Sequence, residues 1–232
     1  MTNQNCCIIF GASGGLGQSL VSAISSETEQ RVIAVARTKS ENSNIDYWCD
    51  NRDLGAVANL FSTIENSHGE ISSVLDFSGV SQRSYFSKLS EHEIQEIIQT
   101  NIIGPINLAH ALANRSKSDN YAKLILVSSV VTKYPVSGAN VYATSKGAIE
   151  SFVEASSKEL LRNNVIINAV RLGYFDKGMI KDVPEVLLES SISRSSVGRI
   201  GNISDLLPIV KLFMNDSTAF LTGTTISLTG GG

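Results

Sequence analysis

The sequence of 232 residues is long enough for one large α/β domain, which buries roughly 70–75% of the surface of its unfolded chain. Its balance of 42% hydrophobic and 18% charged residues is typical of a globular protein and excludes an extensively disordered chain. The formal net charge of -3 provides no general attraction for nucleic acid or for an anionic membrane, so we expect a small-molecule partner.

The start of the chain has none of the features of a signal peptide. Met1 to Asn5 carries no basic residue, and the apolar run that follows is short. The three cysteines, Cys6, Cys7 and Cys49, lack the spacing of a metal site, so we expect reduced thiols, no bound metal and a cytoplasmic protein. As neighbours on a strand, Cys6 and Cys7 are expected on opposite faces of the sheet.

Apolar runs alternate with amphipathic stretches along the whole chain. We expect strands at 6–10, 32–36, 74–77, 124–127, 165–170 and 224–228, a short strand before Asp50, and helices at 16–24, 56–64, 90–113, 141–162 and 206–214. Strands that are apolar on both faces predict a Rossmann-type, doubly wound parallel sheet of about seven strands, with helices on both faces. No linker or repeat interrupts the pattern, so we expect a single nucleotide-binding domain over residues 1–232.

The segment 174–201 has a weaker apolar period and is rich in Ser, Lys, Asp and Arg. It follows a strand end, and ligands of open α/β sheets bind at the carboxyl ends of the strands. We therefore interpret it as a substrate lid, with an ordinary surface excursion as the alternative.

The first strand leads directly into a glycine-rich turn and then a helix. Residues without a Cβ allow the backbone to approach a pyrophosphate, and the helix N-terminus offers free N–H groups. The residues that we expect around the phosphates are Gly11, Ser13, Gly14, Gly15, Leu16 and Gly17.

The end of the second strand distinguishes between two dinucleotides. A protein that binds NAD(H) has Asp or Glu there to bind the ribose 2'-hydroxyl, whereas this chain has Arg37. A guanidinium suits a 2'-phosphate, so we predict NADP(H), with a solvated strand-end arginine as the alternative. Asp50 is a candidate for the adenine amino group or for a role in capping its loop.

Tyr142 and Lys146 lie four residues apart on a predicted helix, so they share one face. A phenol with a pKa near 10 is a poor proton shuttle at neutral pH, and a neighbouring ammonium lowers that pKa by stabilising the phenolate. Ser129 follows the strand 124–127 and is placed to hydrogen-bond a substrate oxygen.

Together these residues resemble the short-chain dehydrogenase/reductase family, in its order and over essentially the whole chain. The family's Gly-x-x-x-Gly-x-Gly loop is matched by Gly11, Gly15 and Gly17, and its Tyr-x-x-x-Lys motif by Tyr142 and Lys146. Further matches are the segment with the family's catalytic Asn at 100–104, its serine strand at 128–129, its Pro-Gly segment at 170–173 and its C-terminal patterns at 198–201 and 221–223.

The resemblance implies hydride transfer between a nicotinamide and a carbonyl carbon. It implies that Tyr142 gives a proton to the carbonyl oxygen, that Lys146 lowers the Tyr142 pKa and holds the nicotinamide ribose, and that Ser129 positions the substrate oxygen. Asn101 would hold a water that links Lys146 to solvent. The further cofactor contacts that the resemblance implies are Ser78, Gly79 and Gly173.

The sequence departs from the family pattern in four places, one of them the pair Asp76-Phe77. Phe10 stands in place of Thr and Asp76-Phe77 in place of Asn-Asn, and because these two segments contact each other, the joint change predicts an apolar contact in place of a polar one. Leu172 replaces Pro, and Lys177 replaces a Thr that contacts the carboxamide. We expect some change in cofactor geometry.

Within the family the chain most resembles 3-oxoacyl-[acyl-carrier-protein] reductases, which implies NADPH-dependent reduction of a 3-oxoacyl thioester on acyl carrier protein. Lys158 and Arg162 only approximate the basic residues that bind the carrier. The alternative substrates are a small ketone, a sugar or another secondary alcohol. A non-catalytic NADP-binding regulatory protein is a third hypothesis, and the intact set of four catalytic residues argues against it. By resemblance, the helices around 91–113 and 141–162 form a homodimer or homotetramer.

Overall fold

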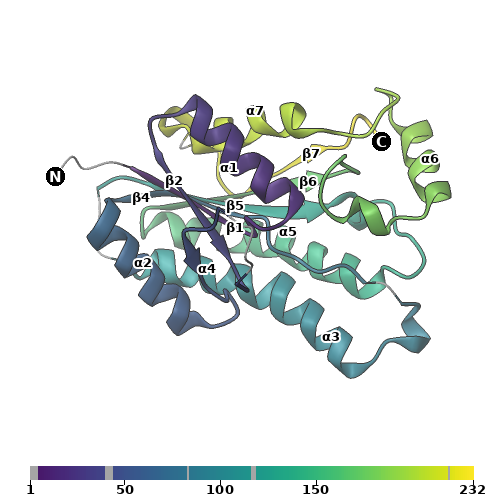
Figure 1. Cartoon of the computed structure of the whole chain (residues 1–232), viewed down its shortest axis with the longest axis horizontal. Coiled ribbons are helices and arrows are strands. Elements are labelled where there is room, and N and C mark those ends of the chain that lie inside the picture. The colour runs from purple at the N-terminus through teal and green to yellow at the C-terminus, as the bar shows by residue number, and fades with distance from the viewer. Residues whose placement is uncertain (1–4, 40–43, 83, 116–118, 219) are drawn as a thin grey trace.

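The computed structural model describes residues 5–39, 44–82, 84–115, 119–218 and 220–232. Its strands are β1 Cys6–Phe10, β2 Arg31–Ala36, β3 Tyr47–Trp48, β4 Ile71–Asp76, β5 Ala122–Ser129, β6 Val165–Leu172 and β7 Thr225–Leu228. They form one parallel sheet in the order β3-β2-β1-β4-β5-β6-β7 (Figure 1). The order in which successive strands are added to the sheet reverses between β1 and β4. This confirms the predicted doubly wound sheet.

Helices cover both faces of the sheet (Figure 1). The helices are α1 Gly15–Glu27, α2 Leu54–His68, α3 Glu91–Ile98, α4 Gly104–Ala113, α5 Asn140–Leu161, α6 Glu185–Arg194 and α7 Ile203–Met214. Side chains of α2, α4 and α5 form one buried cluster with one face of the sheet, and side chains of α1 and α7 form a second cluster with the other face. Within the described ranges, no helix has the length and apolarity needed to cross a membrane.

The neighbouring cysteines of β1 show how strictly the two faces alternate. Cys6 belongs to the cluster with α2, α4 and α5, and Cys7 to the cluster with α1 and α7, as predicted. Both are buried and form no disulfide, as is true of Cys49, and burial raises the pKa of the Cys7 thiol to about 12. A thiol with so high a pKa is an inert part of the core at neutral pH.

The stretch predicted as one helix over 90–113 contains a wider turn. The predicted capping box between Ser90 and Glu93 is present and starts α3, but Gln99–Ile103 is a π-helical turn before α4. The expectation of an uninterrupted helix is therefore wrong here, because the apolar period does not record a local widening of the helix. The turn buries Thr100 and Asn101, and π-helical turns of this kind are frequent at functional sites.

The segment 174–201 is anchored at both ends. Phe175 and Gly201 form a parallel bridge at its base, and Asp176 N donates a hydrogen bond to Gly201 O at 2.9 Å. Between these ends lie a short 3-10 turn at Met179–Asp182 and then α6. The segment is thus an ordered excursion at the carboxyl end of β6, and its movement as a lid stays a prediction.

Candidate active site

The glycine-rich loop between β1 and α1 has a shape that side chains would prevent. Gly11 has a φ of 74°, and a Cβ on it would lie 2.5 Å from the carbonyl carbon of Phe77. A Cβ on Gly17 would lie 2.3 Å from Gly11 O. Gly14, the N-cap of α1, provides no side-chain cap, so N–H groups of the first turn remain available. With Ser13 exposed beside them, these groups fit a phosphate at the positive end of the helix dipole.

The segment 174–201 reaches this loop. A Cβ on Gly15 would lie 2.7 Å from Gly178 N and 3.4 Å from the Cβ of Lys177. Leu16 lies on the other side of the same contact, with its Cγ 3.6 Å from the position of a Cβ on Gly178. The structure therefore places Lys177 and Gly178 against the expected phosphate-binding residues, which the sequence pattern did not indicate.

Arg37, just after β2, belongs to a network of four charged side chains. Its Nη1 pairs with Glu96 Oε1 of α3 at 2.7 Å, and Arg52 Nη1 pairs with Glu96 Oε2 at 2.6 Å. Arg52 also donates to both oxygens of Asp50, and these hydrogen bonds lower the pKa of Asp50. The Arg37 side chain is 41% exposed and accessible to an anion. Asp50 accepts from Arg52 N, as its capping alternative predicts, and its adenine contact stays a prediction.

A buried carboxylate lies at the end of β4. Ser78 donates to Asp76 Oδ1 from both its N and its Oγ, and Asn51 Nδ2 donates to Ser78 Oγ at 3.0 Å. The expected apolar contact between Phe10 and Phe77 is wrong, because their side chains pack on opposite faces of the sheet. The two segments meet through their backbones, where Phe77 N donates to Phe10 O at 3.1 Å. The polar side-chain contact lies instead within the turn after β4, between Ser78 and Asp76.

Four predicted catalytic residues converge at the carboxyl ends of β4 and β5. Tyr142 and Lys146 lie on α5, and Ser129, the last residue of β5, lies near enough to the Tyr142 side chain to act on its pKa. Lys146 Nζ lies 5.9 Å from the centroid of the Tyr142 ring and donates to Val127 O at 2.9 Å. A Cβ on Gly79 would lie 3.6 Å from Lys146 Nζ, which places the predicted Gly79 in the same group.

Asn101 in the π-helical turn lies beside this group with its side chain fully engaged. Its Oδ1 accepts from Val80 N at 2.9 Å, and its Nδ2 donates to Val80 O at 2.9 Å and to Ser145 Oγ at 3.0 Å. Both amide hydrogens are therefore in use. The predicted water between Asn101 and Lys146 stays a prediction, and Ser145 is a partner that the sequence pattern did not reveal.

Burial controls the charges of the Tyr142 and Lys146 side chains. It lowers the pKa of Lys146 from 10.5 to about 8, while the nearby Asp76 carboxyl acts to raise that pKa. Burial also raises the pKa of Tyr142, and the hydrogen bond from Ser129 acts to lower it. In this structure the pKa of Tyr142 is therefore raised and not lowered, and Ser129 is the group that opposes the rise.

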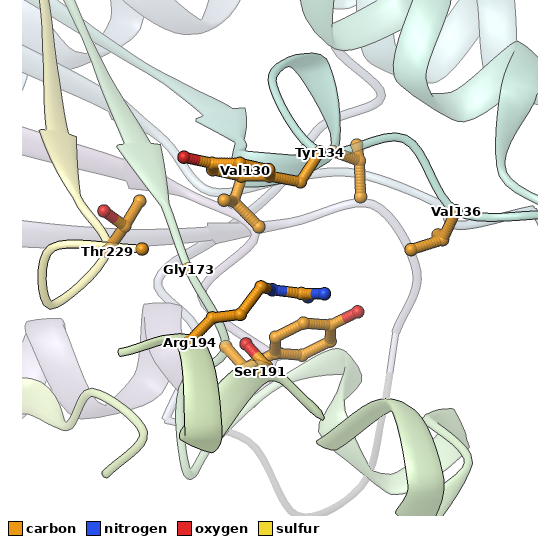
Figure 2. Close-up of a pocket in the computed structure, with 10 residues that line it drawn as sticks. Val130, Tyr134, Val136, Gly173, Ser191, Arg194 and Thr229 are labelled. Carbon is orange, nitrogen blue, oxygen red and sulfur yellow. The ribbon is translucent and has the colours of Figure 1, made fainter. Parts of the chain in front are cut away.

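A cavity begins directly after Ser129. It is lined by Val130, Val131, Tyr134, Val136, Gly173, Tyr174, Ser191, Arg194, Thr229 and Gly232. Figure 2 shows the side chains of Arg194 and Ser191 facing Val130 and Tyr134 across it. The Arg194 guanidinium lies 5.9 Å from the centroid of the Tyr134 ring. The predicted Gly173 thus lies just after the end of β6 and borders the cavity that begins at the residue after Ser129.

A doubly wound sheet, a glycine-rich loop before α1 and a Tyr-Lys pair on α5 together define a dinucleotide-binding α/β oxidoreductase. The family model described as short chain dehydrogenase matches residues 5–187. The chain belongs to the short-chain dehydrogenase family, and it is an oxidoreductase that acts on CH–OH and C=O groups.

Curated relatives and solved structures resemble the chain over its whole length. It is 25% identical to acetoacetyl-CoA reductase of Shinella zoogloeoides and 23% identical to 3-oxoacyl-[acyl-carrier-protein] reductase FabG of Thermotoga maritima, with 97% of this chain and 96% of each relative covered. A short-chain type dehydrogenase/reductase from Mycobacterium ulcerans matches with a TM-score of 0.86 and 16% identity, covering 100% of this chain and 90% of that one. ElxO with NADP bound matches with a TM-score of 0.85 and 18% identity, covering 98% of both chains.

Two glycine substitutions test the loop geometry against a matched control. We expect Gly17→Ala to lower the free energy of unfolding by about 1–3 kcal/mol, because its Cβ collides with Gly11 O. Gly147→Ala, on α5 with no atom within 4 Å of the added Cβ, should raise it by about 0.5–1 kcal/mol. Urea unfolding of both variants measures the difference, and equal stability would contradict the close contact in the loop.

Proposed function

We propose that the protein reduces a carbonyl group to a secondary alcohol with NADPH, and that its substrate is a 3-oxoacyl thioester. The observation that carries the proposal is the grouping of Tyr142, the buried Lys146 ammonium and Ser129, with Lys146 Nζ 5.9 Å from the centroid of the Tyr142 ring and bonded to Val127 O of the strand that ends at Ser129. When bound, NADPH supplies the hydride. The protein's part is to hold the substrate oxygen and deliver a proton to it.

Each residue of the group has a separate task in this proposal. Tyr142 donates its proton to the substrate oxygen, and Ser129 holds that oxygen and stabilises charge on the phenol. Lys146 is protonated below pH about 8 and keeps positive charge at the centre of the site. It also binds the nicotinamide ribose, while the turn that carries Asn101 supports a water route from Lys146 to solvent.

The features around α1 and β2 support NADP(H) as the cofactor. The uncapped start of α1 suits the diphosphate, and the partly exposed guanidinium of Arg37 suits a 2'-phosphate. Arg52 pairs with both Glu96 and Asp50, so the two acidic side chains near Arg37 are balanced and do not repel a phosphate. The bound NADP in the solved ElxO structure accords with this assignment.

The activities for which the relatives are named support a 3-oxoacyl thioester, because they reduce acyl groups attached to a carrier protein or to CoA. Three valines in the cavity after Ser129, namely Val130, Val131 and Val136, suit an acyl chain. A small ketone, a sugar or another secondary alcohol is the alternative substrate, and a non-catalytic NADP-binding regulator is the third possibility. We also propose a cytoplasmic homodimer or homotetramer with two-fold symmetry.

The cofactor assignment predicts a selective effect at Arg37. We expect Arg37→Ala to weaken NADPH binding about tenfold, the loss of one charge-assisted contact, and to leave NADH binding nearly unchanged. Fluorescence titration with both cofactors measures this, with Arg31→Ala at the far end of β2 as control. An equal loss for NADPH and NADH would contradict a role in binding the 2'-phosphate.

The catalytic assignment predicts a loss of turnover without a loss of binding. We expect Tyr142→Phe to lower kcat with acetoacetyl-CoA by about 10²–10⁴-fold, because no proton donor replaces the phenol. NADPH affinity should stay within about twofold of wild type, since no charge is removed. Tyr121→Phe, next to the opposite end of β5, is the matched control. A fully active Tyr142→Phe variant would rule out the proposed mechanism.

The charge of Lys146 predicts the pH dependence. Because its pKa is lowered to about 8, the ammonium form is complete at lower pH and is lost as the pH rises through that value. We therefore expect kcat/KM for reduction to fall above pH about 8. Asp76→Asn removes the carboxyl that raises the Lys146 pKa and should move this fall to lower pH. A shift to higher pH would show that another group controls the fall of kcat/KM.

A further inference from the structure

A nearly buried ion pair links α5 to β6 behind the catalytic residues. Arg171 Nε donates to Glu150 Oε1 at 2.8 Å, and Arg171 Nη2 donates to Glu150 Oε2 at 2.6 Å. The side chains of Arg171 and Glu150 are only 12% and 17% exposed. Glu150 lies one turn after Lys146 on the same helix, yet the proposed proton transfer uses neither member of the pair.

Glu150 also binds the polypeptide on both sides of Ser129. Ser128 Oγ donates to Glu150 Oε1 at 2.6 Å, and Thr132 Oγ1 lies 3.0 Å from the same oxygen. Thr132 Oγ1 is also 3.0 Å from Ser129 O. The residue just before Ser129 and the turn just after it are thus both attached to the helix that carries Tyr142.

Arg171 fixes the same segment from the neighbouring strands. In the register of the sheet it lies opposite Ser128, its Nε is 3.2 Å from Thr132 Oγ1, and its Nη1 donates to Ser227 Oγ of β7 at 2.6 Å. The ion pair therefore joins α5, β5, β6 and β7 at a single point. That point lies one residue from Ser129 along β5.

Stability alone is a poor explanation for such a pair. Removing two charges from water costs several kcal/mol, and well-packed apolar residues of similar size often stabilise a protein as much or more. A charged pair differs from an apolar one because a bidentate contact fixes the relative orientation of its two side chains. Ser129 and Tyr142 come from different elements and must stay within hydrogen-bonding distance, so a fixed geometry has a use here.

We propose that Glu150 and Arg171 are positioning residues that hold Ser129 against Tyr142 through Ser128 and Thr132. This inference rests on the proposed function, because it assigns value to the placement of Ser129 beside Tyr142. Neither residue touches the substrate in this account. Both act on the rate of the chemical step through the placement of Ser129.

Kinetics of Glu150→Gln and Arg171→Met test the proposal. Each should lower kcat for acetoacetyl-CoA by about tenfold or more, as small displacements of reacting groups do, with NADPH affinity within about twofold of wild type. The double variant Glu150→Met, Arg171→Met should recover thermal stability but not kcat. Lys211→Met, which removes an exposed ion pair with Glu27, is the control and should leave kcat unchanged. Wild-type kcat in both single variants would overturn the proposal.

A double-mutant cycle separates positioning from a general structural effect. If Glu150 acts through Ser129, Glu150→Gln should have almost no further effect on kcat in a Ser129→Ala background. A loss as large in that background as in the wild type would show that Glu150 acts independently of Ser129, and would overturn the proposal.

Amide hydrogen exchange gives a reading that needs no turnover. Exchange over residues 128–132 in the NADP complex should become faster in Glu150→Gln and Arg171→Met but not in Lys211→Met. Unchanged exchange in the first two variants would contradict the positioning role. A wild-type protein that reduces no carbonyl, or an active Tyr142→Phe variant, would instead remove the proposed function while leaving the exchange result to be judged separately.

Discussion

The burial of one ammonium group organises the carboxyl ends of the central strands. Lys146 lies in the interior with its Nζ bonded to Val127 O, and burial lowers its pKa to about 8. A buried charge needs a nearby polar or charged partner, and the buried Asp76 carboxyl is one. The ammonium also needs space, and Gly79, which has no side chain, leaves that space open. The site is therefore built around a group that is costly to bury and titrates near neutral pH.

The backbone around this group follows from the same constraint of close approach. Gly11 lets the loop after β1 contact the turn after β4, and Gly17 lets α1 begin against that loop. The π-helical turn buries Asn101 against Val80 and Ser145. These contacts place the start of α1, the end of β4 and the middle of α5 together. A cofactor held at the start of α1 and a substrate held beside the middle of α5 can then meet at one point.

Local patterns in the sequence predicted much of the fold and the candidate site. The Ser90 capping box, the alternation of Cys6 and Cys7 and the glycine-rich loop depend on neighbouring residues, and the structure confirms each of them. Contacts between distant residues were not predictable in this way. The pairs of Arg37 with Glu96 and of Glu150 with Arg171 are 59 and 21 residues apart, and only the packing of helices on the sheet brings them together. The π-helical turn was missed for a different reason, since a local widening leaves the apolar pattern of the helix nearly intact.

The central claim is that the chain transfers hydride to a carbonyl carbon and a proton to its oxygen. The most direct test is to incubate the protein with acetoacetyl-CoA and NADPH that carries deuterium at both C4 positions, and to analyse the product by mass spectrometry. If the protein transfers hydride from NADPH to the carbonyl carbon, the product is 3-hydroxybutyryl-CoA with one deuterium on the carbinol carbon. A protein that binds NADPH but forms no deuterated alcohol, either from this thioester or from a small ketone, would contradict hydride transfer. That result would favour a protein that binds the nucleotide without catalysis.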